Sequence, residues 1–93
     1  MKWIEVIQLR SAGSNREILE HKLNRLIDDF SKRKKNPEMM AYSRALIDSD
    51  FSIQLLHDSN EVETGGSHLG LRLVSAFKEF GLVHHSIWIE LNS

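Results

Sequence analysis

Hydrophobic and polar positions follow two different periods along this chain, and the two periods alternate. Two-residue alternation predicts β-strands, whereas three- and four-residue spacing of apolar positions predicts helices. The resulting order, strand-helix-strand-strand-helix-strand, is that of the ferredoxin-like α+β fold, with a four-stranded antiparallel sheet and two helices on one face. We therefore expect residues 1–93 to form a single domain. The predicted strands cover residues 3–9, 39–47, 51–57 and 82–91, with a turn at 48–50, and the predicted helices cover about 15–32 and about 68–80.

Capping and breaking residues indicate where the two helices begin and end. Ser14, followed three residues later by Glu17, has the spacing of a capping box at the start of the first helix. The Asn36–Pro37 pair ends that helix, because proline does not continue a helix beyond its preceding residue. Ser67 is expected to cap the second helix and Gly81 to end it.

Several strands carry apolar side chains on both of their faces. In the first strand, Trp3 and Ile7 point to one side while Ile4 and Val6 point to the other. Two helices cover only one face of a four-stranded sheet, and a wet second face is normally polar. The pattern therefore predicts a second covering surface. A second copy of the chain is the simplest source, because symmetric dimers are the commonest oligomers.

The most distinctive stretch runs from Leu69 to Val83, LGLRLVSAFKEFGLV, and continues as HHSIWIE at residues 84–90. With the order of elements and the two-sided strands, it resembles the dimeric α+β-barrel superfamily, which includes antibiotic-biosynthesis monooxygenase-like and stress-responsive barrel proteins. The resemblance implies that two open sheets face each other to form a barrel. It covers the whole chain but includes no catalytic motif, so it assigns no active residue.

Composition excludes several kinds of chemistry and of partner. The net charge of −1 argues against binding to nucleic acids or to membrane surfaces, which calls for a strong basic bias. The absence of cysteine excludes disulfides, thiolate metal sites and thiol nucleophiles. The N-terminal segment reads directly as a strand rather than as a signal peptide, and no apolar stretch approaches the ~20 residues that span a bilayer. We therefore expect a cytoplasmic protein.

The five histidines do not form a recognisable metal-binding pattern. No pair has the spacing that places two ligands on one helix face. His57 ends the third strand and His84–His85 begin the fourth, so these histidines are expected at opposite edges of the sheet. His84 and His85 point to opposite faces, and His85 shares its face with aliphatic residues, as a core histidine does. No metal and no cofactor are expected.

Five residues are candidates for a binding pocket: Trp3, Tyr42, Arg44, His84 and Trp88. Of these, His84, Tyr42 and Trp88 are the candidate catalytic residues. Aromatic walls with a few polar groups suit a flat organic ligand, although aromatic residues are also enriched in protein interfaces. The first hypothesis is a small homodimeric interaction or ligand-binding module without catalysis. The alternative, which the resemblance implies, is a cofactor-free monooxygenase-like enzyme acting on a small aromatic or quinol compound. A convergent polar pair in an enclosed cavity, such as His84 with Tyr42, would favour the enzyme.

Two further functions of this fold find little support in the sequence. The loop at 10–16 precedes a helix, where a phosphate can bind, but it lacks the phosphate-loop pattern of acylphosphatases. RNA binding would need stacking aromatics on the first and third strands. The third strand, beginning at Phe51, lacks the corresponding motif.

Overall fold

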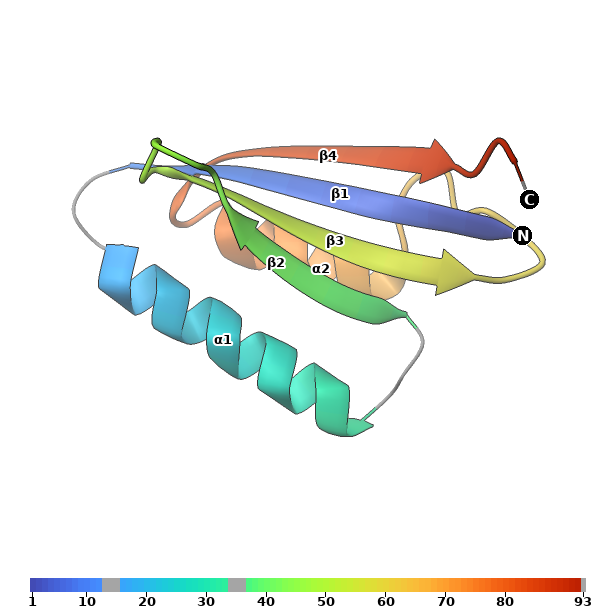
Figure 1. The fold of residues 1–93 in the computed structure, drawn as a ribbon, viewed down its shortest axis with the longest axis horizontal. Helices are drawn as coiled ribbons and strands as arrows, with labels where there is room; N and C mark the ends of the chain where they lie inside the picture. Colours follow the sequence, from blue (N-terminus) through green and yellow to red (C-terminus); the bar gives the residue numbers. More distant parts are fainter. Residues whose placement is uncertain (13–15, 34–36, 93) are drawn as a thin grey trace.

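The computed structural model of the protein describes residues 1–12, 16–33 and 37–92. The elements follow the order expected from the sequence (Figure 1). Their bounds are β1 (Lys2–Ser11), α1 (Arg16–Arg33), β2 (Glu38–Ser43), β3 (Asp50–Asp58), α2 (His68–Phe77) and β4 (Gly81–Ile89).

The four strands form one antiparallel sheet in the order β2-β3-β1-β4. Strand β1 lies at the centre beside β3 and β4, and β2 is the far edge (Figure 1). This order and pairing confirm the ferredoxin-like α+β architecture. The start of β1 and the end of β4 lie at the same end of the sheet (Figure 1).

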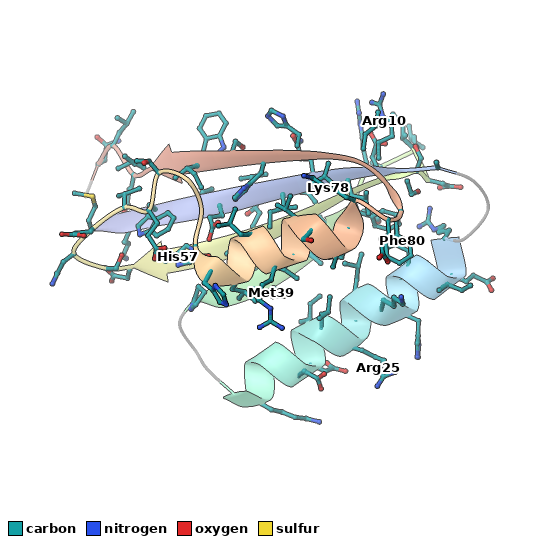
Figure 2. The ribbon with its side chains drawn as sticks, turned by 180° about the vertical axis from the view of Figure 1, so that it is seen from behind. Arg10, Arg25, Met39, His57, Lys78 and Phe80 are labelled. Carbon is teal, nitrogen blue, oxygen red and sulfur yellow. The ribbon has the colours of Figure 1, made fainter. Side chains whose placement is uncertain are left out.

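Both helices pack against the same face of the sheet, as Figure 2 shows from the helix side. The alternation of β1 explains this choice of face, because Trp3, Ile7 and Leu9 are almost completely buried while Gln8 is exposed. Leu19 and Leu23 contribute the buried stripe of α1, and Leu73 and Phe77 that of α2. These side chains form one core with Phe51, Ile53 and Leu55 of β3.

The second strand is shorter than the alternation predicted. Strand β2 ends at Ser43, and residues 44–49 form the connection to β3. Within it, Leu46 has a φ of 67° and is fully exposed. Backbone hydrogen bonds from Ile47 N–H to the Arg44 carbonyl and from Arg44 N–H to the Asp50 carbonyl close the connection. The apolar residues Leu46 and Ile47 extended the predicted strand to residue 47. The turn instead ends the strand pairing of β2 at Ser43, before either residue.

The end of α2 also differs from the prediction, because the helix stops at Phe77 and a turn at 78–80 follows. Gly81, expected as the residue that ends the helix, is instead the first residue of β4 and pairs with Ser11. Ser67 caps α2 as predicted, accepting a hydrogen bond from the Gly70 N–H at 3.0 Å. The predicted Ser14 cap and Asn36 lie outside the described residues. In the described part of the chain, no helix is long and apolar enough to cross a membrane.

Candidate functional site

The sheet face opposite the helices, called the open face below, arranges its side chains in rows that run across the four strands. The central rows contain few charges, because Glu38 at the β2 edge is their one formally charged member among these described residues. In order from β4 to β2, the three central rows are Trp88-Ile4-Leu56-Glu38, Ser86-Val6-Gln54-Met40 and His84-Gln8-Ser52-Tyr42.

Charged residues flank the central rows at both ends of the open face. At one end Lys2 pairs in register with Asp58, and at the other Arg10 pairs with Asp50. Asp50 accepts from Arg10 Nε at 3.3 Å and from Arg44 Nη1 at 3.0 Å. Desolvation raises the pKa of Asp50, but the bonds from Arg44, Ser49 and Arg10 outweigh it, so the pKa lies below its usual value. Asp50 therefore holds both arginines as an ionised carboxylate.

Of the candidate residues identified from the sequence, Tyr42, His84 and Trp88 lie on the open face and remain accessible. The prediction is wrong for Trp3, which is 2 % exposed on the helix-covered face, because its position in the alternation of β1 is shared with the core residues Ile7 and Leu9. Trp88 is 60 % exposed and Tyr42 is 46 % exposed, and His84 is also exposed. Trp88 Nε1 donates a hydrogen bond to Ser86 Oγ at 2.9 Å, which holds the indole against its own strand. Trp88 continues a row of apolar side chains with Ile4 and Leu56. A contiguous exposed apolar patch, unlike a single exposed residue, is typical of an interaction site.

The open face has two hollows of different character. The polar hollow, of about 640 Å³, is lined by Gln8, Arg10, Tyr42, Arg44, Ser52 and His84, among others. The apolar hollow, of about 370 Å³, lies at the other end, where Ile4, Leu56 and Trp88 contribute most of the apolar surface. The volume of the polar hollow lies within the range of small-molecule sites, about 300–1,000 Å³.

His84 and Tyr42 line the polar hollow from opposite sides. They belong to the same cross-strand row, but β4 and β2 are the two edge strands of the sheet. Three strand spacings of about 4.8 Å separate them, so their backbones lie about 14 Å apart. Within one protomer they therefore do not form the convergent, enclosed polar pair that would favour the enzyme hypothesis.

The helix-covered side contains a polar cluster that the sequence analysis did not identify. Glu5 is completely buried, and its carboxylate accepts four hydrogen bonds. Oε2 accepts from His57 Nε2 at 2.6 Å and from Ser67 Oγ. Oε1 accepts from His85 Nε2 at 2.9 Å and from the Ser67 N–H at 3.0 Å. Four donors occupy the approximately four lone-pair sites of an ionised carboxylate.

The surroundings of Glu5 favour its charged form. Burial raises the pKa of Glu5, but the bonds from Ser67, His57 and His85 outweigh burial, so the pKa lies below its usual value. The N-terminus of α2, which begins just after Ser67, adds the positive end of a helix dipole. Gly70 leaves room for the carboxylate, because a Cβ there would overlap it.

The expected separation of the histidines is wrong for His57 and His85. His57 pairs with Trp3 and His85 with Ile7, which places them on either side of Glu5 on the same face. The prediction failed because β4 begins at Gly81, which places His85 in the middle of the strand rather than at its start, and the register then brings both rings beside Glu5. His85 is the hydrogen-bonded core histidine that the alternation indicated, and Trp3 stacks on His57 with ring centroids 3.9 Å apart.

One signal in the sequence could have identified this cluster. Glu5 occupies a core position between Trp3 and Ile7, and a carboxylate at such a position requires partners. Its burial leaves no route for a substrate, so the cluster is suited to joining elements rather than to catalysis. Among residues 1–12, 16–33 and 37–92, no group of histidine and acidic side chains has the arrangement of a metal site.

Comparisons with known proteins do not assign the chain to a family. No protein-family model, no curated protein sequence and no solved structure matches it. The functional argument therefore rests on the open face and its rows of side chains.

Proposed function

We propose that the protein is a small homodimeric interaction or ligand-binding module without catalysis, in which two copies pair through their open faces. The observation that carries the proposal is the placement of Trp88, 60 % exposed, in central rows that are nearly free of charge. Depletion of charge and enrichment in aromatic residues distinguish the centre of a protein interface from ordinary surface. The arrangement would be that of the dimeric α+β barrels.

The size of the open face supports a second copy as the covering partner. Strands of 10, 6, 9 and 9 residues in β1 to β4, with about 3.3 Å per residue and about 4.8 Å between strands, give a face of about 540 Å² in flat projection. Corrugation by side chains increases the accessible area toward the ~800 Å² per partner of a stable interface. Closely apposed sheets also pack at about 10 Å, the thickness of one layer of interdigitating side chains from each.

The cofactor-free monooxygenase-like alternative would require a different local geometry in the single chain. His84 and Tyr42 would need to converge on a substrate in an enclosed cavity, but they lie on opposite edge strands of an open hollow. No other observation in the described residues favours redox chemistry over binding. The non-catalytic module is therefore the function that the geometry of the single chain supports best, and only a pair formed across a dimer interface would meet the criterion for the enzyme.

Sedimentation of the Trp88→Ala variant tests the proposal. Truncation of a buried aromatic anchor often costs about 2 kcal/mol or more, so we expect the dimer dissociation constant to rise by at least about tenfold. Ile18→Ala is the matched control, because Ile18 is 56 % exposed on α1, away from the open face. A wild-type protein that sediments only as a 10.7 kDa species at micromolar concentration would refute the dimer.

A further inference from the structure

The charged rows at the ends of the open face distinguish between two ways of pairing two copies. This inference rests on the proposed dimer and concerns its symmetry and its ligand. We infer that the two-fold axis runs parallel to the strands, between β1 and β3. We further infer that it joins His84 of one protomer to the partner's Tyr42 over the polar hollow, forming a site for a small organic anion.

Face-to-face pairing requires a two-fold axis in the plane of the interface, and the axis can run along the strands or across them. An axis along the strands preserves each row and exchanges its two sides. Lys2 then faces the partner's Asp58, and Arg10 faces the partner's Asp50. Both facings, repeated by symmetry, bring opposite charges together, which favours association and fixes register.

An axis across the strands gives the opposite result. It keeps each strand over its own copy and exchanges the two ends of the sheet. Arg10 then faces the partner's Lys2, and Asp50 faces the partner's Asp58. Juxtaposed like charges at an interface cost several kcal/mol. Each end of the open face carries one positive and one negative residue side by side, Lys2 with Asp58 and Arg10 with Asp50. This arrangement of charges therefore favours the axis along the strands.

The selected axis completes a site that one chain contains only in halves. It places β4 of one protomer over the partner's β2, so His84 lies opposite the partner's Tyr42 in the same row. Both side chains are exposed toward the gap of about 10 Å between packed sheets, although the Tyr42 hydroxyl donates a weak hydrogen bond to Met40 Sδ at 3.5 Å within its own chain. The symmetry produces two such pairs per dimer. Both pairs line the space in which the polar hollows of the two protomers face each other.

The charge of the polar hollow indicates which ligands it would take. Arg10 and Arg44 outnumber Asp50, so the three groups sum to one positive charge. Within one chain each arginine uses one nitrogen on Asp50. In the inferred dimer Arg10 also faces the partner's Asp50, so Arg44, whose other donors have no partner in the described part of the chain, is the arginine left to bind a ligand. Tyr42 and Leu82, which is 76 % exposed, provide apolar walls. A carboxylate on a small apolar body matches these features.

Cross-linking determines the axis, and the natural absence of cysteine makes single-site labelling straightforward. Ser86 faces the partner's Met40 if the axis runs along the strands, but faces the partner's Ser86 if it runs across them. With a bismaleimide of about 10 Å span, a mixture of Ser86→Cys and Met40→Cys proteins should form a covalent dimer. Neither variant alone should do so. Cross-linking of Ser86→Cys to itself would overturn the inferred axis.

Calorimetric titration of the dimer with benzoate tests the ligand, with benzamide as the uncharged probe of matched shape. We expect saturable binding of benzoate and none of benzamide. Arg44→Gln should weaken benzoate binding by about tenfold or more, while Arg25→Gln on α1 should leave it unchanged. Absence of benzoate binding by a correctly cross-linking dimer would overturn the anion site. A protein that stays monomeric would instead show that the proposed function itself has failed.

Discussion

His57 Nε2 lies 2.6 Å from the carboxylate of Glu5, although the two residues are 52 positions apart in the chain. The contact crosses from β3 to the central strand β1 and is buried beneath Trp3. A carboxylate without solvent contact is stable only when its hydrogen-bonding capacity is met. The stability of the domain should therefore depend strongly on this one side chain.

Replacement of Glu5 by glutamine should destabilise the fold by about 3 kcal/mol or more. The amide has nearly the same shape, but its NH₂ group turns donors toward donors on His57, His85 or Ser67, and buried groups are then left unpaired. Urea denaturation at pH 7 measures the change. Glu79→Gln is the control, since Glu79 is exposed after α2. Equal midpoints for the two variants would contradict the described cluster.

The same carboxylate predicts a specific sensitivity to acid. The pKa of Glu5 is lower in the folded protein than in the unfolded chain, where a glutamate titrates near about 4.3. Its contribution to stability is therefore complete above that value and declines as the pH falls through the lower folded pKa. The difference in unfolding free energy between wild type and Glu5→Gln should shrink from pH 6 to pH 3. A difference that is constant with pH would show that Glu5 does not titrate as described.

Gly70→Ala should destabilise the protein, although replacement of glycine by alanine within a helix usually stabilises it. Alanine in place of glycine within a helix normally stabilises by about 0.5–1 kcal/mol. At Gly70 the added methyl group would overlap the Glu5 carboxylate, so we expect the variant to be less stable than wild type. Thermal denaturation followed by circular dichroism gives the sign. Ser75→Ala, on the exposed side of the same helix, should change stability by less than about 0.5 kcal/mol.

Phe77→Ala should cost much more than Leu71→Ala on the same helix. Phe77 is 2 % exposed in the core, where truncation of an aromatic residue typically costs about 3–5 kcal/mol. Leu71 is 50 % exposed, so its truncation should change little. Chemical denaturation of the two variants compares them directly. Similar losses of stability would mean that α2 presents a different side to the sheet.

We also predict that the protein holds no tightly bound metal. The Nε2 atoms of His57 and His85 are already bonded to Glu5, and the chain has no cysteine ligand. Elemental analysis of protein purified without chelators should show well under one ion per chain. A stoichiometric zinc or iron signal that disappears in His57→Ala would disprove this prediction.

The sequence predicted the architecture well because period and spacing are local properties. The stripe through Leu73 and Phe77 identified the buried side of α2. Alternation at Trp3–Leu9 identified which residues of β1 share a face, but not which face is buried, because both faces carry apolar side chains. Boundaries were less predictable, because Leu46 and Ile47 continued the strand period into a turn. The end of β2 is determined by backbone hydrogen bonds between the turn and Asp50, and the spacing of apolar residues does not reveal these bonds.

The candidate site was predicted only in part, for a related reason. His84, Tyr42 and Trp88 were correctly placed on one face, since alternation decides the face of each strand residue. The Glu5 cluster depends instead on the register of three strands and on the entry of α2, none of which a single sequence specifies. His57 and His85 were separated because they were assigned to opposite ends of their strands. The register instead places them opposite Trp3 and Ile7, the two same-face neighbours of Glu5.

The donors that surround Glu5 also bear on how the chain folds. His57, Ser67 and His85 are 52, 62 and 80 residues away from it in sequence. Closing such long loops costs entropy before any bond is gained, and contacts of this kind slow folding. The carboxylate is fully paired only when β1, β3, β4 and the start of α2 have all assembled. The cluster thus links the two halves of the chain into one cooperative unit, so that a partly assembled chain leaves a desolvated charge without its partners.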